Sequence, residues 1–163
     1  MNALIRLPEV SDFINECCRI DPKILVFDDG SYQPCEGGFP ALQIPVDDRF
    51  GVPYDIVAYA VDDPVVWWMR CGLATVLGEH ALFVAEWRGQ AVNLYPTPAA
   101  WLHSRDYAGV CVLDWTANLR LVLGRVPEVR CLSRTLANEL AQRLQEQVKP
   151  RFAITVRGER HAA

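Results

Sequence analysis

The chain has 163 residues, 51% of them hydrophobic, and its formal net charge at neutral pH is −4. This length suits one domain, and this composition can supply a sizeable core. The negative charge gives no chain-wide attraction for nucleic acid or for an anionic membrane, so we expect neither as a partner. The sequence has no apolar run of about 18 residues and no secretory signal at its start, so we expect a cytoplasmic protein.

The first part of the chain predicts one helix and three strands. Apolar side chains recur with helical spacing over residues 8–20, which predicts a helix there. Residues 28–40 are rich in Gly, Pro, Asp and Ser and predict the longest loop. Short apolar runs bounded by turn residues predict strands at residues 24–27, 41–46 and 54–60.

Residues 62–72 predict a short helix that has almost no polar side. An Asp-Pro pair near its start and Gly72 at its end are typical of helix termini. The side chains between them are apolar except for Arg70, and they include the adjacent pair Trp67 and Trp68. A helix that is apolar all round must be covered all round, either by its own fold or by a partner. Both alternatives stay open.

The second half of the chain predicts a hairpin, two helices and three further strands. Residues 82–87 and 91–95 flank a short loop that contains glycine, which predicts a β-hairpin. A short helix is expected after Pro98, and residues 116–126 fit either a helical turn or a loop. Leucines repeat every four residues over 134–148 and predict a long amphipathic helix. The further strands are expected at residues 110–113, 129–132 and 152–156.

These elements predict a single α+β domain over residues 1–157, followed by a flexible tail at residues 158–163. The adjacent early strands and the hairpin break a purely alternating order of strands and helices. We therefore expect a mixed, partly antiparallel sheet of about six to eight strands with about four helices packed on it.

Carboxylates end three of the apolar runs. They are Asp28, Glu86 and Asp114. Ligands of open α/β sheets bind beyond the carboxyl ends of strands, and carboxylate oxygens suit Mg²⁺ or Mn²⁺. Aspartate at a strand end is also ordinary turn chemistry, because its side chain bonds nearby backbone N–H groups.

The pair Glu86 and Asp114 resembles the metal site of the toprim domains of primases and topoisomerases. That family places a glutamate after one strand and Asp-x-Asp after another. In this chain Trp87 stands where a glycine usually follows the glutamate, and Thr116 stands where the second aspartate should be. The resemblance covers residues 82–116 and implies a divalent-metal-dependent enzyme acting on nucleotides or phosphoesters.

The six cysteines show no Cys-x-x-Cys spacing and are interpreted as small buried hydrophobes in a reducing compartment. Cys35 lies in the predicted loop, but no spacing ties it to His80 or His103 as a base. The sequence contains no complete catalytic motif, and we predict no catalytic residue.

Aromatic side chains give the stronger indication, because Trp, Tyr and Arg are enriched at interface hot spots. A large aromatic core would explain the same composition. We predict a non-enzymatic protein-interaction module without a cofactor, which binds a protein partner or itself as a homodimer through an aromatic helix surface. A small acidic chain with free cysteines would suit a bacterial or phage accessory protein. The predicted contact residues are Trp67, Trp68, Arg70, Tyr95 and Trp101. The alternative is the toprim-like metal enzyme, with Mg²⁺ or Mn²⁺ held by Asp28, Glu86 and Asp114.

Overall fold

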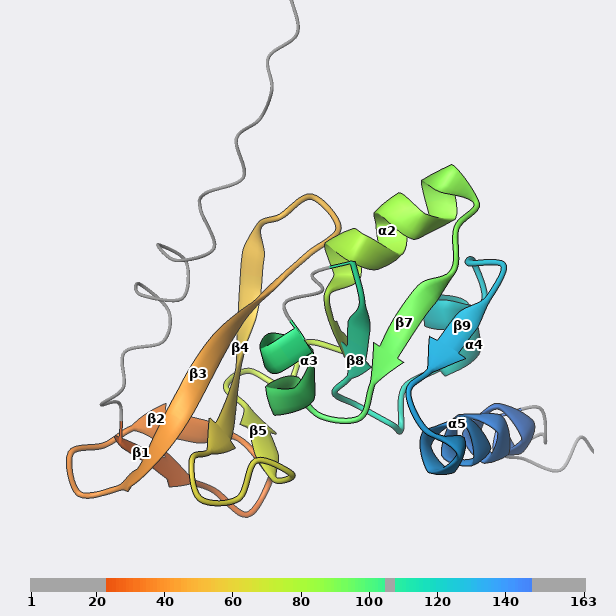
Figure 1. The fold of residues 1–163 in the computed structure, drawn as a ribbon. Coiled ribbons are helices and arrows are strands. Elements are labelled where there is room, and N and C mark those ends of the chain that lie inside the picture. The colour runs from red at the N-terminus through yellow and green to blue at the C-terminus, as the bar shows by residue number, and fades with distance from the viewer. Residues whose placement is uncertain (1–22, 105–107, 148–163) are drawn as a thin grey trace, which may run out of the picture.

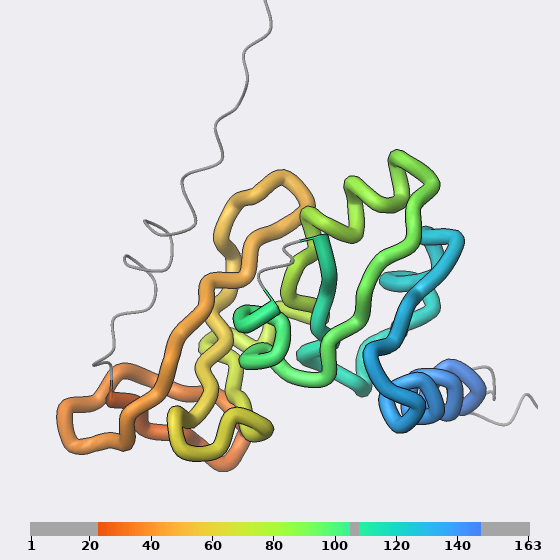
Figure 2. The backbone as a smooth tube through the Cα atoms, in the orientation of Figure 1, coloured from red at the N-terminus to blue at the C-terminus, as the bar shows by residue number. Residues whose placement is uncertain are grey.

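The structure, a computed structural model, describes residues 23–104 and 108–147. Within these ranges the chain forms nine strands and four helices, and the strands make up two sheets (Figure 1). The earlier residues form one sheet and the later residues form the other sheet with the helices, as the backbone path shows (Figure 2). The predicted α+β class is confirmed. The strands, however, divide between two sheets, where one sheet of about six to eight strands was expected.

The first sheet has five strands: β1 (Lys23–Val26), β2 (Tyr32–Pro34), β3 (Phe39–Asp47), β4 (Pro53–Ala60) and β5 (Trp67–Met69). All neighbours are antiparallel, in the order β2-β1-β3-β4-β5. The long β3–β4 hairpin reaches from the short strands toward the helices (Figure 1). At its tip the Asp48 carboxylate accepts the backbone N–H groups of Phe50 and Val52 at 2.8 and 2.9 Å, which fixes the turn.

The second sheet has four strands: β6 (Val76–Leu77), β7 (Val92–Tyr95), β8 (Val110–Val112) and β9 (Val129–Cys131). Its order is β6-β8-β7-β9, with β7 parallel to β8 and β9, and β6 antiparallel to β8. The helices are α2 (Glu79–Arg88), α3 (Pro98–Ser104), α4 (Leu119–Leu123) and α5 (Arg134–Glu146).

Alternate side chains of β8 divide the core into two parts, because successive residues of a strand point to opposite faces. Val110 and Val112 are buried in one cluster with side chains of α2, α4 and α5. Cys111 is buried in another cluster with α3 and with side chains of β3 and β4. The four-stranded sheet is therefore covered on both faces, on one of them by α3 and the five-stranded sheet.

Several predicted elements are confirmed within a few residues. The strands at 41–46, 54–60, 110–113 and 129–132 are present, as is the short helix after Pro98. The long amphipathic helix is α5, whose capping residue Ser133 accepts the N–H of Leu136 at 3.1 Å. Part of residues 116–126 forms α4, a helical turn. The expectations for residues 8–20, 152–156 and 158–163 lie outside the described residues.

The predicted hairpin at residues 82–95 is wrong in its first arm, which is the helix α2. Leu82 and Ala85 are buried three residues apart, which is helical spacing. Gly78 and Gly89 bracket the helix with positive φ angles of 90° and 61°, a region that glycine adopts at little cost. Glu86 therefore lies in a helix and does not end a strand.

The predicted helix at residues 62–72 is also wrong, because Trp67–Met69 form the edge strand β5. They pair with β4 in the register Tyr59↔Trp67, Ala58↔Trp68 and Val57↔Met69. A strand sends the two tryptophans to opposite faces, and each face has apolar cover. The all-round apolarity of the segment thus reflects a two-sided strand. The predicted loop at residues 28–40 is also wrong in part, because it contains the strand β2.

A buried carboxylate ties the two sheets together. Asp55 on β4 is only 3% exposed and accepts four backbone N–H groups. One is that of Ile56, at 2.8 Å, and the others lie in the link between β5 and β6, those of Cys71 (2.9 Å), Leu73 (2.8 Å) and Ala74 (3.1 Å). Hydrogen bonds to an ionised acceptor are stronger than neutral ones, and buried N–H groups need an acceptor. Asp55 therefore fixes the course of the chain from one sheet to the other.

Replacing this carboxylate should destabilise the whole fold. In Asp55→Asn the amide NH₂ replaces one acceptor oxygen and faces backbone donors, so we expect the free energy of unfolding to fall by about 3 kcal/mol. Asp48→Asn is the control, because it changes a half-buried turn carboxylate and should lower the same quantity by about 1 kcal/mol. Urea titrations of the three proteins measure both values, and equal losses would contradict the assignment.

Candidate functional site

Among the predicted contact residues, the two tryptophans of β5 are half-buried against different parts of the fold. Trp67 packs in the core between the sheets, and its Nε1 donates to the carbonyl oxygen of Leu113 at 3.3 Å. Trp68 lies on the opposite face, edge-on to Phe39 with ring centroids 5.2 Å apart. Arg70, just after the strand, is exposed.

Tyr95 and Trp101 are core residues, each 6% exposed. They belong to the same buried cluster as Trp67, and the Trp101 Nε1 donates to the carbonyl oxygen of Gly109 at 2.8 Å. Their rings hold α3 against the sheet, so neither offers surface to a partner. The structure thus places Tyr95 and Trp101 in one buried cluster and packs the half-buried Trp67 against it, an arrangement that fits the aromatic-core alternative.

The three carboxylates predicted as alternative metal ligands lie on separate elements. Asp28 is in the turn between β1 and β2, and Glu86 is on α2. Asp114 follows β8 and accepts the backbone N–H and the hydroxyl of Thr116 at 2.8 and 2.6 Å, which is turn chemistry. Residues 23–104 and 108–147 contain no group of three or more His, Cys, Asp or Glu side chains placed to hold a metal ion.

Cys35, considered above as a nucleophile, and the two histidines considered as its base belong to different elements. Cys35 follows β2, in the five-stranded sheet. His80 on α2 places Nδ1 3.0 Å from the carbonyl oxygen of Arg49, and His103 on α3 places Nδ1 2.8 Å from that of Ala99.

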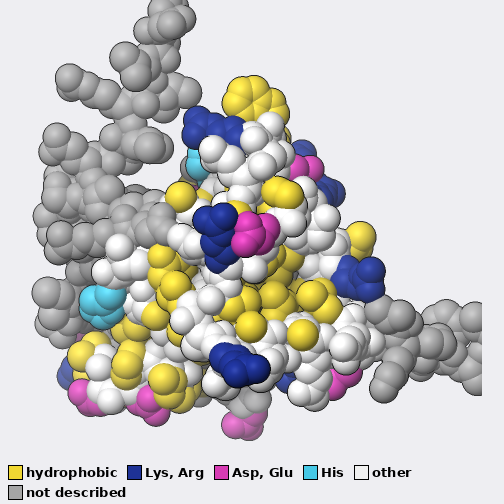
Figure 3. All heavy atoms as spheres, turned by 45° about the vertical axis from the view of Figure 1, so that its right-hand side comes forward, with side chains coloured by type: hydrophobic (Ala, Val, Ile, Leu, Met, Phe, Trp, Pro, Cys, Tyr) yellow, Lys and Arg dark blue, Asp and Glu magenta, His cyan; other side chains and the backbone are white. Residues whose placement is uncertain are grey.

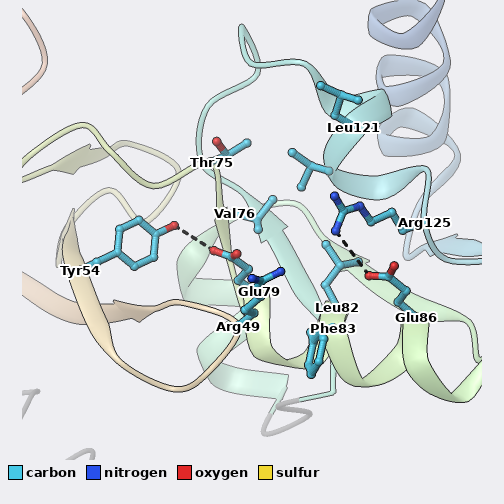
Figure 4. Close-up of a pocket in the computed structure, with 11 residues that line it drawn as sticks. Arg49, Tyr54, Thr75, Val76, Glu79, Leu82, Phe83, Glu86, Leu121 and Arg125 are labelled. Atoms are coloured by element: carbon cyan, nitrogen blue, oxygen red, sulfur yellow. Dashed lines mark hydrogen bonds and ion pairs between the residues drawn. The ribbon is translucent and has the colours of Figure 1, made fainter.

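The sequence did not indicate a groove that lies between α2 and α4 and has a volume of about 360 Å³. One face of α2 forms its wall through four side chains spaced at i, i+3, i+4 and i+7, namely Glu79, Leu82, Phe83 and Glu86. The opposite wall comes from Leu121, Val122 and Arg125, and the remaining lining residues are Arg49, Tyr54, Thr75 and Val76 (Figure 4).

Large apolar side chains stand exposed along this groove. Trp87 on α2 is 79% exposed and lies one helical turn beyond Phe83, which is also exposed. Phe50, from the hairpin tip, is 67% exposed and has its ring centroid 6.4 Å from that of Phe83. Leu121, across the groove, is 68% exposed. We call the groove together with Phe50 and Trp87 the α2–α4 surface.

The side of the molecule that carries the helices also shows apolar side chains at its surface. In Figure 3 they gather at the centre and at the upper tip of the view, with basic and acidic side chains around them. An apolar centre with a charged rim is the usual anatomy of a protein interface.

A hydrogen bond lies at one end of the groove and an ion pair lies at the other end. At one end the Tyr54 hydroxyl donates to Glu79 Oε2 at 3.2 Å, and burial, helped by the Glu79 charge, raises the pKa of that hydroxyl above its ordinary value. Tyr54 therefore remains a protonated donor at neutral pH. At the other end Arg125 Nη1 lies 3.8 Å from Glu86 Oε2 (Figure 4).

Behind the hairpin tip, Asp47 is held in an unfavourable setting for a charge. Its Oδ1 is buried with no hydrogen-bond partner in the described part of the chain. Burial raises the pKa of this carboxyl, the charge of Asp48 adds to the rise, and His80 opposes it. The ionised form of Asp47 therefore destabilises the fold.

Comparison with protein-family models, with curated proteins and with solved structures gave no match for this chain. Among the described residues, no helix is both long and apolar enough to cross a membrane.

The setting of Asp47 gives a pH-dependent prediction. Its folded pKa is raised above the ordinary value of 3.8, so its contribution to stability falls as pH rises through the raised pKa. We expect Asp47→Asn to raise the melting temperature at pH 7 by roughly 1–3 °C. This advantage should vanish as the pH is lowered to about 2.5, below the ordinary pKa of 3.8, where the wild-type carboxyl is largely protonated in both states. Calorimetric scans across this range test it, and a lower melting temperature at pH 7 would contradict it.

Proposed function

We propose that this chain is a protein-binding domain and that its partner docks on the α2–α4 surface. The observation that carries the proposal is the exposure of Trp87, 79%, beside the exposed rings of Phe83 and Phe50. Tryptophan is enriched at interface hot spots, and contiguous exposed apolar side chains are typical of binding surfaces. The proposal keeps the predicted class of function but moves the binding surface from the Trp67–Trp68 segment to α2.

The form of the groove supports a macromolecular partner. Its lining includes the apolar side chains of Val76, Leu82 and Val122, and also Arg49 and Arg125. A partner can thus bury apolar side chains at the centre and satisfy charges at the edge. The α2 wall is helical, so its backbone would lose little conformational freedom on binding.

A photo-crosslinker placed at single positions tests the proposal in cells that produce the protein. Trp87 and Leu121 would each be replaced by benzoylphenylalanine, and Val65, which is also exposed but lies on the five-stranded sheet side, is the control position. We expect discrete protein adducts from positions 87 and 121 and none from position 65.

The crosslinked protein is then identified by mass spectrometry and its affinity measured with purified components. Trp87→Ala should weaken binding by about tenfold or more, while Val65→Ala should leave it unchanged. Both side chains are exposed, so the melting temperature should change little in either variant. Adducts at position 65 alone, or an affinity indifferent to Trp87→Ala, would overturn the proposal.

A further inference from the structure

We infer that the partner on the α2–α4 surface is a second copy of this chain, related by a two-fold axis across the groove. This inference rests on the proposed function and names its partner. Two-fold dimers are the commonest protein oligomers, and they require a surface that is complementary to itself. The α2–α4 surface meets that requirement in its charges, in its apolar side chains and in the direction of α2.

The charges of the groove are balanced. Its lining contains two arginines and two glutamates, which sum to zero, while the whole chain has a net charge of −4. A surface with one dominant sign would select a partner of the opposite sign, whereas a balanced surface matches a rotated copy of itself. The four side chains are Arg49, Arg125, Glu79 and Glu86.

The positions of these charges set the pairing. Glu79 and Glu86 are two helical turns apart on α2, about 10 Å along its axis. Arg49 stands at the Glu79 end, since its carbonyl oxygen lies 3.0 Å from His80 Nδ1, and Arg125 stands at the Glu86 end. A two-fold axis through the middle exchanges the ends. Arg49 then faces Glu86 of the second copy, and Arg125 faces Glu79 of the second copy.

The ion pair between Glu86 and Arg125 within one chain is weak, so both side chains can pair with a second copy instead. Glu86 and Arg125 are 3.8 Å apart and both are exposed, so their attraction is weak in water. Arg49 lies over the ring of Phe50, 4.7 Å from its centroid, and has no ion pair among the described residues. Both ends of the groove can therefore gain charge pairs on association.

The apolar side chains and the helix direction favour the same arrangement. A two-fold axis puts the two α2 helices antiparallel, which opposes their dipoles favourably. It also brings Phe83, near the midpoint between Glu79 and Glu86, toward its counterpart, and it places Trp87 at the end where the second copy carries Arg49 and Phe50. Each copy then covers the exposed aromatic stripe of the other.

Charge exchange between two variants tests the pairing. Glu86→Arg places two cations opposite each other in the dimer, and Arg49→Glu places two anions opposite each other. We expect each variant alone to raise the dimer dissociation constant at least tenfold in sedimentation equilibrium, as Trp87→Ala should. A mixture of the two charge variants makes every cross-pair attractive, so native mass spectrometry should find more heterodimer than the statistical half. Arg130→Glu, which reverses a charge of the exposed ion pair of β9 with Glu128, is the control and should not alter dimerisation.

Three results would overturn the inference. They are a monomeric wild-type protein at about 50 µM, a dimer unaffected by these variants, and a statistical mixture of charge variants. A wild-type monomer that still forms adducts with another protein from position 87 would leave the proposed function standing and refute only the second copy. Absence of both the dimer and the adducts would refute both.

Discussion

The buried carboxylate of Asp55 is the interaction on which the arrangement of the two sheets depends. Its oxygens accept the N–H groups of Cys71, Leu73 and Ala74, which lie between the last strand of one sheet and the first strand of the other. These N–H groups lie in a segment without regular secondary structure, so no helical or strand pairing supplies acceptors for them. Because one side chain on β4 supplies the acceptors, the second sheet starts at a fixed place relative to the first.

The α2–α4 surface follows from that placement. The β3–β4 hairpin extends beyond its own sheet to α2, where Phe50 meets Phe83 and the Tyr54 hydroxyl bonds Glu79. The groove is therefore built from both halves of the described chain, with one arginine from the hairpin and another from the residues after α4. A change in the link at Asp55 would be expected to alter the groove as well as the stability.

The sequence predicts an element well where its pattern fits a single kind of secondary structure. The helix α5 has Leu136 and Leu140 buried on one face and Ser133 as its capping residue, so its leucine spacing predicts a helix and not a strand. The segment of β5 is apolar on both sides, and its Pro and Gly neighbours suit either a helix or a two-sided strand. Local chemistry cannot separate these two, because the choice is made by pairing with β4.

The candidate surface was missed for the same reason. Phe83 and Trp87 are four residues apart and share a side in a strand as well as in a helix. The groove wall formed by Glu79, Leu82, Phe83 and Glu86, however, has a spacing that shares one side only in a helix. A hairpin prediction for this segment therefore does not bring these four side chains to one wall. Arg49 and Phe50 reach it through contacts distant in sequence, which no local pattern contains. The toprim-like metal enzyme stays a prediction, with its three carboxylates on separate elements.

Fluorine NMR of the protein labelled with 5-fluorotryptophan tests the central claim, that this chain associates through the α2–α4 surface. The five tryptophans give five resonances, and that of the exposed Trp87 should have the largest solvent isotope shift in dilute solution. The account predicts that raising the concentration moves the Trp87 resonance and abolishes its isotope shift, while that of the buried Trp101 stays constant. A Trp87 resonance that remains solvent-exposed while the protein associates would contradict it.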